Sequence, residues 1–287
     1  MRSLNLNKWI IGARPRTLPA AIAPVVVATA LAASEADFVM AGLALVVSLS
    51  LQVGVNYAND YSDGIKGTDD NRVGPTRLVA SGLASAKSVK QAAFISFAIA
   101  AVIGLLLALA TSLWLIAIGA AAILAAWTYT GSKRPYGYLG LGEISVFLFF
   151  GLVATMGSYF VQTELVTWKS FIVAIPMGSL ACAILAINNL RDRAQDELVG
   201  KRTLAVRLGD SGARKLFIAL LLLAHIAAIS IPGENTLVTL ALLPQTLVIS
   251  NQVRSGVSGP ALIPLLGKTG QLQLWFAIVL SVALALN

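Results

Sequence analysis

Residues 38–70 read FVMAGLALVVSLSLQVGVNYANDYSDGIKGTDD, and the two halves of this stretch differ sharply in polarity. Residues 38–55 carry no charged side chain and are apolar enough to lie in a lipid bilayer, whereas residues 56–70 carry four aspartates and two asparagines. Such groups are costly at the end of a membrane helix unless something pairs with them. The stretch therefore predicts a membrane-spanning helix whose end belongs to a functional site.

The composition of the whole chain also indicates a membrane protein. Of its 287 residues, 57% are hydrophobic and 12% are charged, and the mean hydropathy is +0.81. An average soluble domain has about 25% charged residues. A net charge of +8 would suggest a nucleic-acid partner in a soluble protein, but here we expect no nucleic-acid partner, because membrane topology explains the basic residues. We expect one domain, residues 1–287, embedded in the lipid bilayer.

Apolar stretches of about the length that crosses a bilayer predict nine transmembrane helices. They lie at residues 17–33, 38–58, 91–110, 113–130, 143–162, 170–190, 214–232, 235–250 and 271–286. With a cytoplasmic N-terminus, this arrangement places all 21 basic residues except Lys169 on the inner side. Basic residues are retained on the cytoplasmic side of a membrane. We therefore expect an all-α, multi-pass protein of the cell membrane whose site for charged molecules faces the cytoplasm.

Two groups of acids and amides each lie at the inner end of a predicted span. The first group projects within an arc of about 100° on one helix face, with two further acids beyond it: Asn56, Asn59, Asp60 and Asp63, then Asp69 and Asp70. The second group has a spacing of four and falls within about 80°: Asn188, Asp192 and Asp196. Two such faces turned toward each other would form an oxygen-lined cage.

The residue types in these groups favour magnesium over zinc. Mg²⁺ binds through a few carboxylates together with substrate phosphates, whereas the only histidine and the only cysteine of the chain, His225 and Cys182, lie in separate spans. Basic side chains flank the acids: Lys66, Arg72, Arg77, Lys133, Arg134, Arg191, Arg193, Lys201 and Arg202. Acids that bind a metal beside bases that bind anions are typical of a diphosphate site. The alternative is a pair of solvated helix ends neutralised by neighbouring arginines and lysines.

Three short motifs carry a resemblance to a known family. NDYSD at 59–63, DRAQD at 192–196 and YTGSK at 129–133 resemble the metal-binding and Tyr-x-x-x-Lys motifs of the UbiA superfamily of intramembrane aromatic prenyltransferases. Longer strings, RPRTLPAAIAPV at 14–25 and NNLRDRAQDELVGKRTLAVRLG at 188–209, are similar to the branch that prenylates 1,4-dihydroxy-2-naphthoate. The wider superfamily often has a third acid where Gly67 stands, and the nearest acid here is Asp69. Whether Asp60 or Asp69 contacts the metal is therefore open.

The resemblance implies transfer of a polyprenyl group from polyprenyl diphosphate to 1,4-dihydroxy-2-naphthoate, with loss of CO₂ and diphosphate. It implies a Mg²⁺ cofactor held by Asn59, Asp60, Asp63, Asp69, Asp192 and Asp196. It implies catalytic roles for Asp63, Asp192 and Lys133. It implies substrate-binding roles for Asn56, Arg72, Tyr129, Arg134, Glu143, Asn188, Lys201 and Arg202. An apolar, membrane-enclosed cavity would keep water from the allylic cation.

Several assignments and two other functions stay open at this point. Arg14 or Arg16 could pair with the acceptor carboxylate, and Glu143 could act on the acceptor hydroxyl or pair with Lys133; His225 is expected to have a packing role. Prenylation of another ring, such as 4-hydroxybenzoate or homogentisate, is an alternative. A cation-coupled transporter is a second alternative, because intramembrane acids also mark ion pathways.

Overall fold

The structure is a computed structural model, and it describes residues 2–68, 74, 76–233 and 235–286, with side chains from residue 8 onward. Within these ranges the regular structure is helical and contains no strand. The expected all-α class is therefore confirmed.

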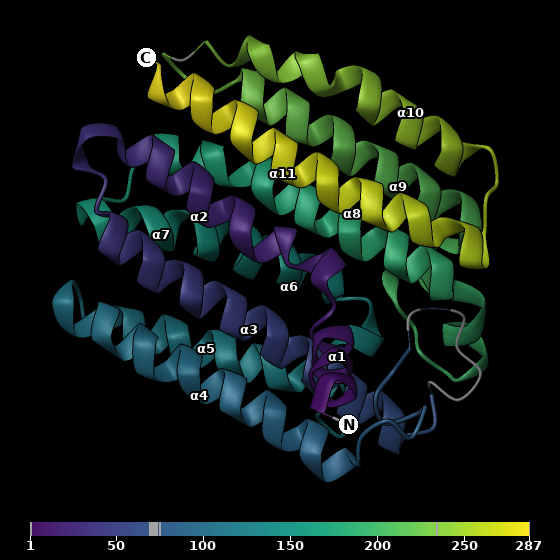
Figure 1. The fold of residues 1–287 in the computed structure, drawn as a ribbon. Helices are drawn as coiled ribbons and strands as arrows, with labels where there is room; N and C mark the ends of the chain where they lie inside the picture. The colour runs from purple at the N-terminus through teal and green to yellow at the C-terminus, as the bar shows by residue number, and fades with distance from the viewer. Residues whose placement is uncertain (1, 69–73, 75, 234, 287) are drawn as a thin grey trace.

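Each of the nine segments expected to span the membrane lies on a helix (Figure 1). The long helices are α1 (Arg2–Ala13), α2 (Pro19–Ala32), α3 (Phe38–Ile65), α4 (Ala86–Ala110), α5 (Trp114–Thr128), α8 (Trp168–Leu198), α9 (Leu204–Ile229), α10 (Leu243–Arg254) and α11 (Ile263–Ala285). Between α5 and α8, the short helix α6 (Gly142–Val146) continues through a π-helical segment, Phe147–Val153, into α7 (Ala154–Thr163). The 3₁₀-helical segment Thr236–Leu242 precedes α10.

The number of clear membrane spans is smaller than nine. Among the described residues, seven helices are long and apolar enough to cross a membrane, and the bent pair Lys8–Thr17 and Pro19–Glu35 adds an eighth if it counts as one span. α5 does not reach this length, because its 15 residues extend only about 22 Å at 1.5 Å per residue. The chain is thus a multi-pass membrane protein with seven or eight candidate spans by length and composition.

The two helices that carry the acidic groups run in the same direction through the bundle and end on the same side (Figure 1). Their starting points are fixed by caps that satisfy free backbone N–H groups. At the start of α3, the Asp37 carboxylate accepts hydrogen bonds from the backbone of Val39 and Met40. At the start of α8, Thr167 and Ser170 form a reciprocal capping box.

α8 is the central helix of the bundle. It packs against α2, α7, α9 and α11, and 83% of its most apolar stretch is buried. A Cβ atom added to Gly151 would lie only 2.6 Å from the Cα of Gly178 in α8. Glycine at both positions lets the π-helical segment touch α8, as small residues do between membrane helices.

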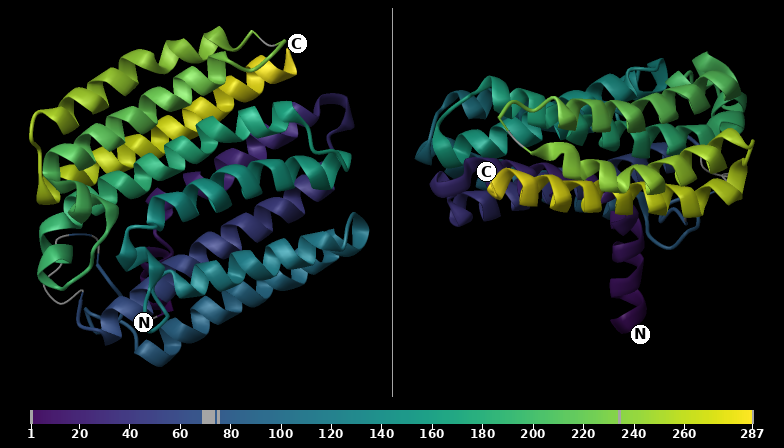
Figure 2. Two further views of the ribbon diagram at one scale, coloured as in Figure 1. Left: turned by 180° about the vertical axis from the view of Figure 1, so that it is seen from behind. Right: turned by 90° about the horizontal axis from the view of Figure 1, so that it is seen from above.

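The N-terminal helix has a different orientation from the rest. In the right-hand view of Figure 2, α1 stands away from the bundle at a steep angle. The chain bends by 54° between the end of α1 and α2, and Arg14 at this bend has a left-handed backbone conformation with φ of 52°. The bend brings residues 14–17 against the end of α3 that carries the first acidic group.

Candidate active site

A cavity of about 710 Å³ lies between α2, α3, α4, α5, α7 and α8, and it has two chemically different ends. The polar end lies where α3 and α8 end, and its lining includes Asn59, Asp63, Arg77, Asp192, Asp196 and Lys201. The apolar end lies toward the opposite side of the bundle, and its lining includes Leu107, Leu115, Ile118, Val153 and Val161. The cavity can therefore hold a molecule with a charged head and a long apolar tail.

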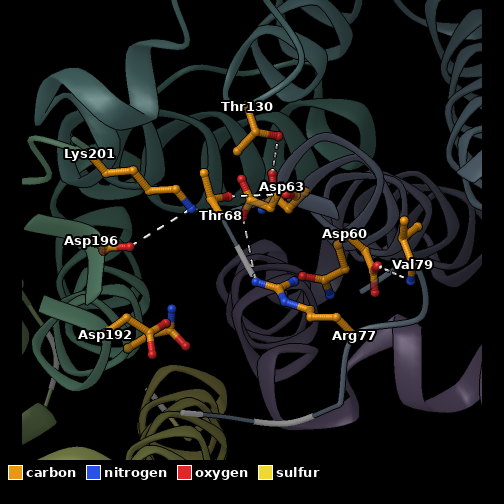
Figure 3. Close-up of polar contacts among 12 residues, drawn as sticks. Asp60, Asp63, Thr68, Arg77, Val79, Thr130, Asp192, Asp196 and Lys201 are labelled. Atoms are coloured by element: carbon orange, nitrogen blue, oxygen red, sulfur yellow. Dashed lines mark hydrogen bonds and ion pairs between the residues drawn. The ribbon is translucent and has the colours of Figure 1, made fainter. Parts of the chain in front are cut away.

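The two acidic helix ends meet through one lysine (Figure 3). The Lys201 ammonium nitrogen lies 3.2 Å from a carboxylate oxygen of Asp63 on α3 and 3.9 Å from one of Asp196 on α8. Lys201 is only 7% exposed, so this contact is shielded from solvent. The expected approach of the second and sixth predicted spans is present in the structure.

Two further side chains complete the surroundings of Asp63. The Tyr138 hydroxyl donates a hydrogen bond to Asp63, and its ring lies under the Lys201 ammonium, 4.8 Å from the ring centre. The Arg77 guanidinium approaches the same carboxylate at 3.9 Å. Tyr138 was not predicted as a site residue, because it lies in the short 3₁₀-helical segment Tyr136–Leu139 between α5 and α6, which is too short for a spacing pattern to indicate its direction.

Asp192 is held by its neighbour in the chain. Arg191 donates two hydrogen bonds of 2.7 Å to the two Asp192 oxygens, and a third of 2.8 Å to the Asn188 side chain. Such a bidentate, charge-assisted pair is strong and geometrically specific. Asp192 and Asp196 nevertheless project from α8 into the same region as Lys201 (Figure 3).

The two asparagines of α3 are fixed by other segments. The Thr130 hydroxyl donates a 2.8 Å hydrogen bond to the Asn59 side-chain oxygen. The Asn56 amide donates to the carbonyl of Ala13 and to the hydroxyl of Thr17 at 2.8 and 3.0 Å. Asn56 therefore joins α3 to the bend after α1, while Asn59 joins it to the end of α5.

Asp60 has a structural position outside the cavity lining. It is fully buried, and its two oxygens accept hydrogen bonds of 2.8 and 3.0 Å from the backbone N–H groups of Leu78 and Val79. In Figure 3 it points toward Val79 and away from Lys201. The loop after α3 folds back onto this carboxylate, so both oxygens are already in use and Asp60 does not suit the expected metal role.

Three of the predicted basic residues lie on the surface. Lys133, Arg134 and Arg202 are exposed and are not among the residues that line the cavity. The chain turns after α5 and directs residues 133–134 outward, so Lys133 lies away from the cavity, and the lysine that contacts Asp63 is Lys201. Asp69 and Arg72, and also Asp70, lie outside the described residues.

The remaining predicted residues lie at the middle of the cavity or beside it. Tyr129 and Asn188 line it. Glu143 is buried behind Asn189, whose amide donates a 3.0 Å hydrogen bond to one Glu143 oxygen. The other Glu143 oxygen has no hydrogen-bond partner among the described residues.

Tyr136, just before α6, also lines the cavity but was not predicted. Its hydroxyl donates to the carbonyl of Ala125 at 2.9 Å, and burial raises the pKa of this phenol above its ordinary value.

The oxygen atoms at the polar end of the cavity fit a divalent metal ion once Arg191 releases Asp192 and Lys201 releases Asp63. Within the described ranges, no group of three His, Cys, Asp or Glu side chains could hold a metal ion as the side chains now stand. Arg191 occupies both oxygens of Asp192. Yet Asn59, Asp63, Asp192 and Asp196 present oxygens to one end of one cavity. Lys201 already places a cation between two of them, and oxygen donors suit Mg²⁺.

Two named relatives are similar to this chain over three quarters or more of its length. It is 49% identical to the 1,4-dihydroxy-2-naphthoate octaprenyltransferase of Mycobacterium tuberculosis over 97% of both chains. It is 41% identical to the enzyme of the same name from Escherichia coli, over 75% of this chain and 72% of that one.

Solved structures share the fold at low sequence identity. A UbiA homologue from Archaeoglobus fulgidus bound to DMAPP and Mg²⁺ is 15% identical, with a TM-score of 0.68 over 96% of this chain and 99% of that one. A UbiA homologue from Aeropyrum pernix is 16% identical, with a TM-score of 0.67 over 94% and 97%. The UbiA prenyltransferase family model matches residues 21–257. The chain belongs to the UbiA prenyltransferase family.

Proposed function

We propose that this chain transfers a polyprenyl group from polyprenyl diphosphate to 1,4-dihydroxy-2-naphthoate, with release of diphosphate and CO₂, and so acts in menaquinone biosynthesis. The names of relatives that are 49% and 41% identical support this reaction. The observation that carries the proposal is the cavity in which Lys201 joins Asp63 to Asp196 at one end and an apolar lining forms the other. A diphosphate fits the first end, and an isoprenoid tail fits the second.

The proposed metal ligands are Asn59, Asp63, Asp192 and Asp196. When bound, Mg²⁺ would neutralise the diphosphate and bridge it to these oxygens. A UbiA homologue of the same fold has been solved with Mg²⁺ and a short prenyl diphosphate. Asp60 is left out of this set, because backbone N–H groups already occupy its oxygens.

The buried bases would change partners when the donor binds. Lys201 and Arg77 contact Asp63 now, and an incoming phosphate group gives both cations a competing anion. Arg191 could likewise exchange Asp192 for phosphate oxygens, because its planar guanidinium pairs bidentately with a carboxylate or a phosphate. As the carbon–oxygen bond of the donor breaks, these cations stabilise the negative charge that develops on the diphosphate.

The middle of the cavity would hold the acceptor ring. The allylic cation left by the diphosphate is attacked by the ring carbon that carries the carboxylate, and this carboxylate then leaves as CO₂. Arg14 and Arg16 both line the cavity, and both are candidates for pairing with the acceptor carboxylate. Glu143, held by Asn189, is a candidate to accept a proton from an acceptor hydroxyl, and Tyr129 packs beside it.

The membrane arrangement belongs to the same proposal. We retain nine spans, counting α5 and the bent pair around Leu18, with the N-terminus and the polar end of the cavity facing the cytoplasm. The positive-inside distribution supports this orientation, since Lys169 alone among the basic residues would then lie outside.

The test is a direct assay with purified protein in lipid vesicles. We expect Mg²⁺, octaprenyl diphosphate and carboxyl-labelled 1,4-dihydroxy-2-naphthoate to give a prenylated naphthoquinol and labelled CO₂, and neither product when Mg²⁺ is chelated. 4-Hydroxybenzoate and homogentisate serve as competing acceptors. Faster prenylation of either would overturn the naphthoate assignment, and cation flux without any prenylated product would point to transport.

A further inference from the structure

Three glycines on three helices line the apolar end of the cavity: Gly104 on α4, Gly119 on α5 and Gly157 on α7. A Cβ atom added to any of them would meet nothing within 4 Å. Gly54 on α3 differs, because a Cβ there would lie 2.5 Å from the Phe97 ring. Close packing therefore explains Gly54 but not the three cavity glycines.

The three glycines lie at a similar depth in the bundle. α4 and α7 end, and α5 begins, on the side opposite the acidic helix ends, and each glycine lies between one and two turns from that terminus. Gly119 is ten residues from Tyr129 in the numbering, or about 15 Å along a helix. The glycines thus surround the cavity well beyond the polar end.

Glycine is a poor helix former, so its presence at three open positions needs a reason other than the helix itself. A side chain at any of these positions would extend into the cavity, because the missing Cβ points into empty space. The effect of glycine here is to keep the apolar end wide.

We propose that Gly104, Gly119 and Gly157 form the passage that admits the distal part of a long donor tail, and so determine the longest prenyl diphosphate that the protein uses. This inference rests on the proposed prenyl transfer. A geranyl tail has two isoprene units and an octaprenyl tail has eight, so the second is four times as long. A two-unit geranyl tail ends before the glycines, whereas an eight-unit octaprenyl tail must pass them.

The test replaces each glycine by leucine and compares two donors with the same acceptor. For Gly119→Leu and Gly157→Leu we expect kcat/KM with octaprenyl diphosphate to fall at least tenfold relative to geranyl diphosphate, with a smaller fall for Gly104→Leu. Gly42→Leu is the matched control, because Gly42 is an open glycine at a similar depth on α3 that does not line the cavity. Its donor ratio should stay at the wild-type value.

Two results would overturn the inference: an unchanged donor ratio in all three leucine variants, or an equal ratio change in the Gly42→Leu control. If a leucine variant loses activity with both donors, the smaller Gly→Ala variants decide by the same ratio. Wild-type protein that makes no product with either donor would instead refute the proposed function. The two failures are therefore distinguishable.

Discussion

The acidic ends of α3 and α8 look alike in sequence but differ in how their carboxylates are used. On α3, Asp63 faces Lys201 in the cavity, while Asp60 faces the other way and binds backbone N–H groups. On α8, Asp192 and Asp196 both face the cavity, and a neighbouring arginine holds the first. Residue type and spacing are similar at the two ends, so the groups that pair with each carboxylate decide which acids remain available for a ligand: a loop backbone on α3 and a neighbouring arginine on α8.

The largest effect that separates the acids is expected for Asp63→Asn. This variant removes a charge from the point where Lys201, Arg77 and Tyr138 converge. We expect prenyl transfer per folded molecule to fall by about 10³-fold, in line with the loss of a major electrostatic group. The melting temperature should fall as well, because two buried cations lose a partner. The rate is measured with saturating Mg²⁺ in vesicles, and near-normal activity would contradict the role of Asp63.

Asp60→Ala should lower the stability of the protein more than its activity. The change leaves two buried N–H groups, of Leu78 and Val79, without an acceptor, and each costs about 1–3 kcal/mol. We expect a clearly lower melting temperature in detergent. The protein that remains folded should keep most of its activity per molecule. A stable variant without activity would instead place Asp60 at the metal.

Substitutions at Lys201 and Lys133 should differ in their effect on kcat, by a smaller factor than those at the two aspartates. Lys201→Met removes the buried cation between α3 and α8, and we expect a loss of about 10²-fold in kcat. Lys133→Met changes an exposed side chain and should stay within about twofold of wild type, since surface substitutions have small effects. Equal losses in both variants would show that Lys133 reaches the diphosphate.

Among the cavity residues, the smallest expected effect concerns the arginine on α8. Arg191→Lys keeps the charge but loses the bidentate pairing with Asp192. We expect KM for the prenyl diphosphate to rise by about tenfold with a smaller change in kcat, because lysine keeps the charge that stabilises the departing diphosphate but loses the second hydrogen bond that helps to bind the donor. Steady-state kinetics with varied donor measure this split, and a change confined to kcat would argue against it.

Much of this architecture could be predicted from the sequence, because apolar runs and helical spacing are local properties. The nine apolar segments are helical, and the spacing of Asn188, Asp192 and Asp196 places them together on one helix face. α5 is shorter than expected, because the chain turns at Tyr129 where the apolar run was expected to continue to residue 130.

Contacts made by loops could not be predicted in the same way. Tyr138 reaches Asp63 from a loop 75 positions away, and Leu78 and Val79 fold back onto Asp60. No periodicity indicates where such residues point. The sequence therefore predicted Lys201 as a binding residue but could not rank it above Lys133, since only the fold buries one and exposes the other.

The central claim is that the ends of α3 and α8 jointly bind one Mg²⁺ ion and the donor diphosphate. A double-mutant cycle tests it most directly, with Asp63→Asn, Asp196→Asn and the double variant. The readout is Mg²⁺-dependent binding of a non-hydrolysable prenyl diphosphate analogue, measured by calorimetry. We predict that the double variant binds little worse than either single variant, with a coupling of about 1–3 kcal/mol. Fully additive losses would mean that the two helix ends act independently and would contradict the account.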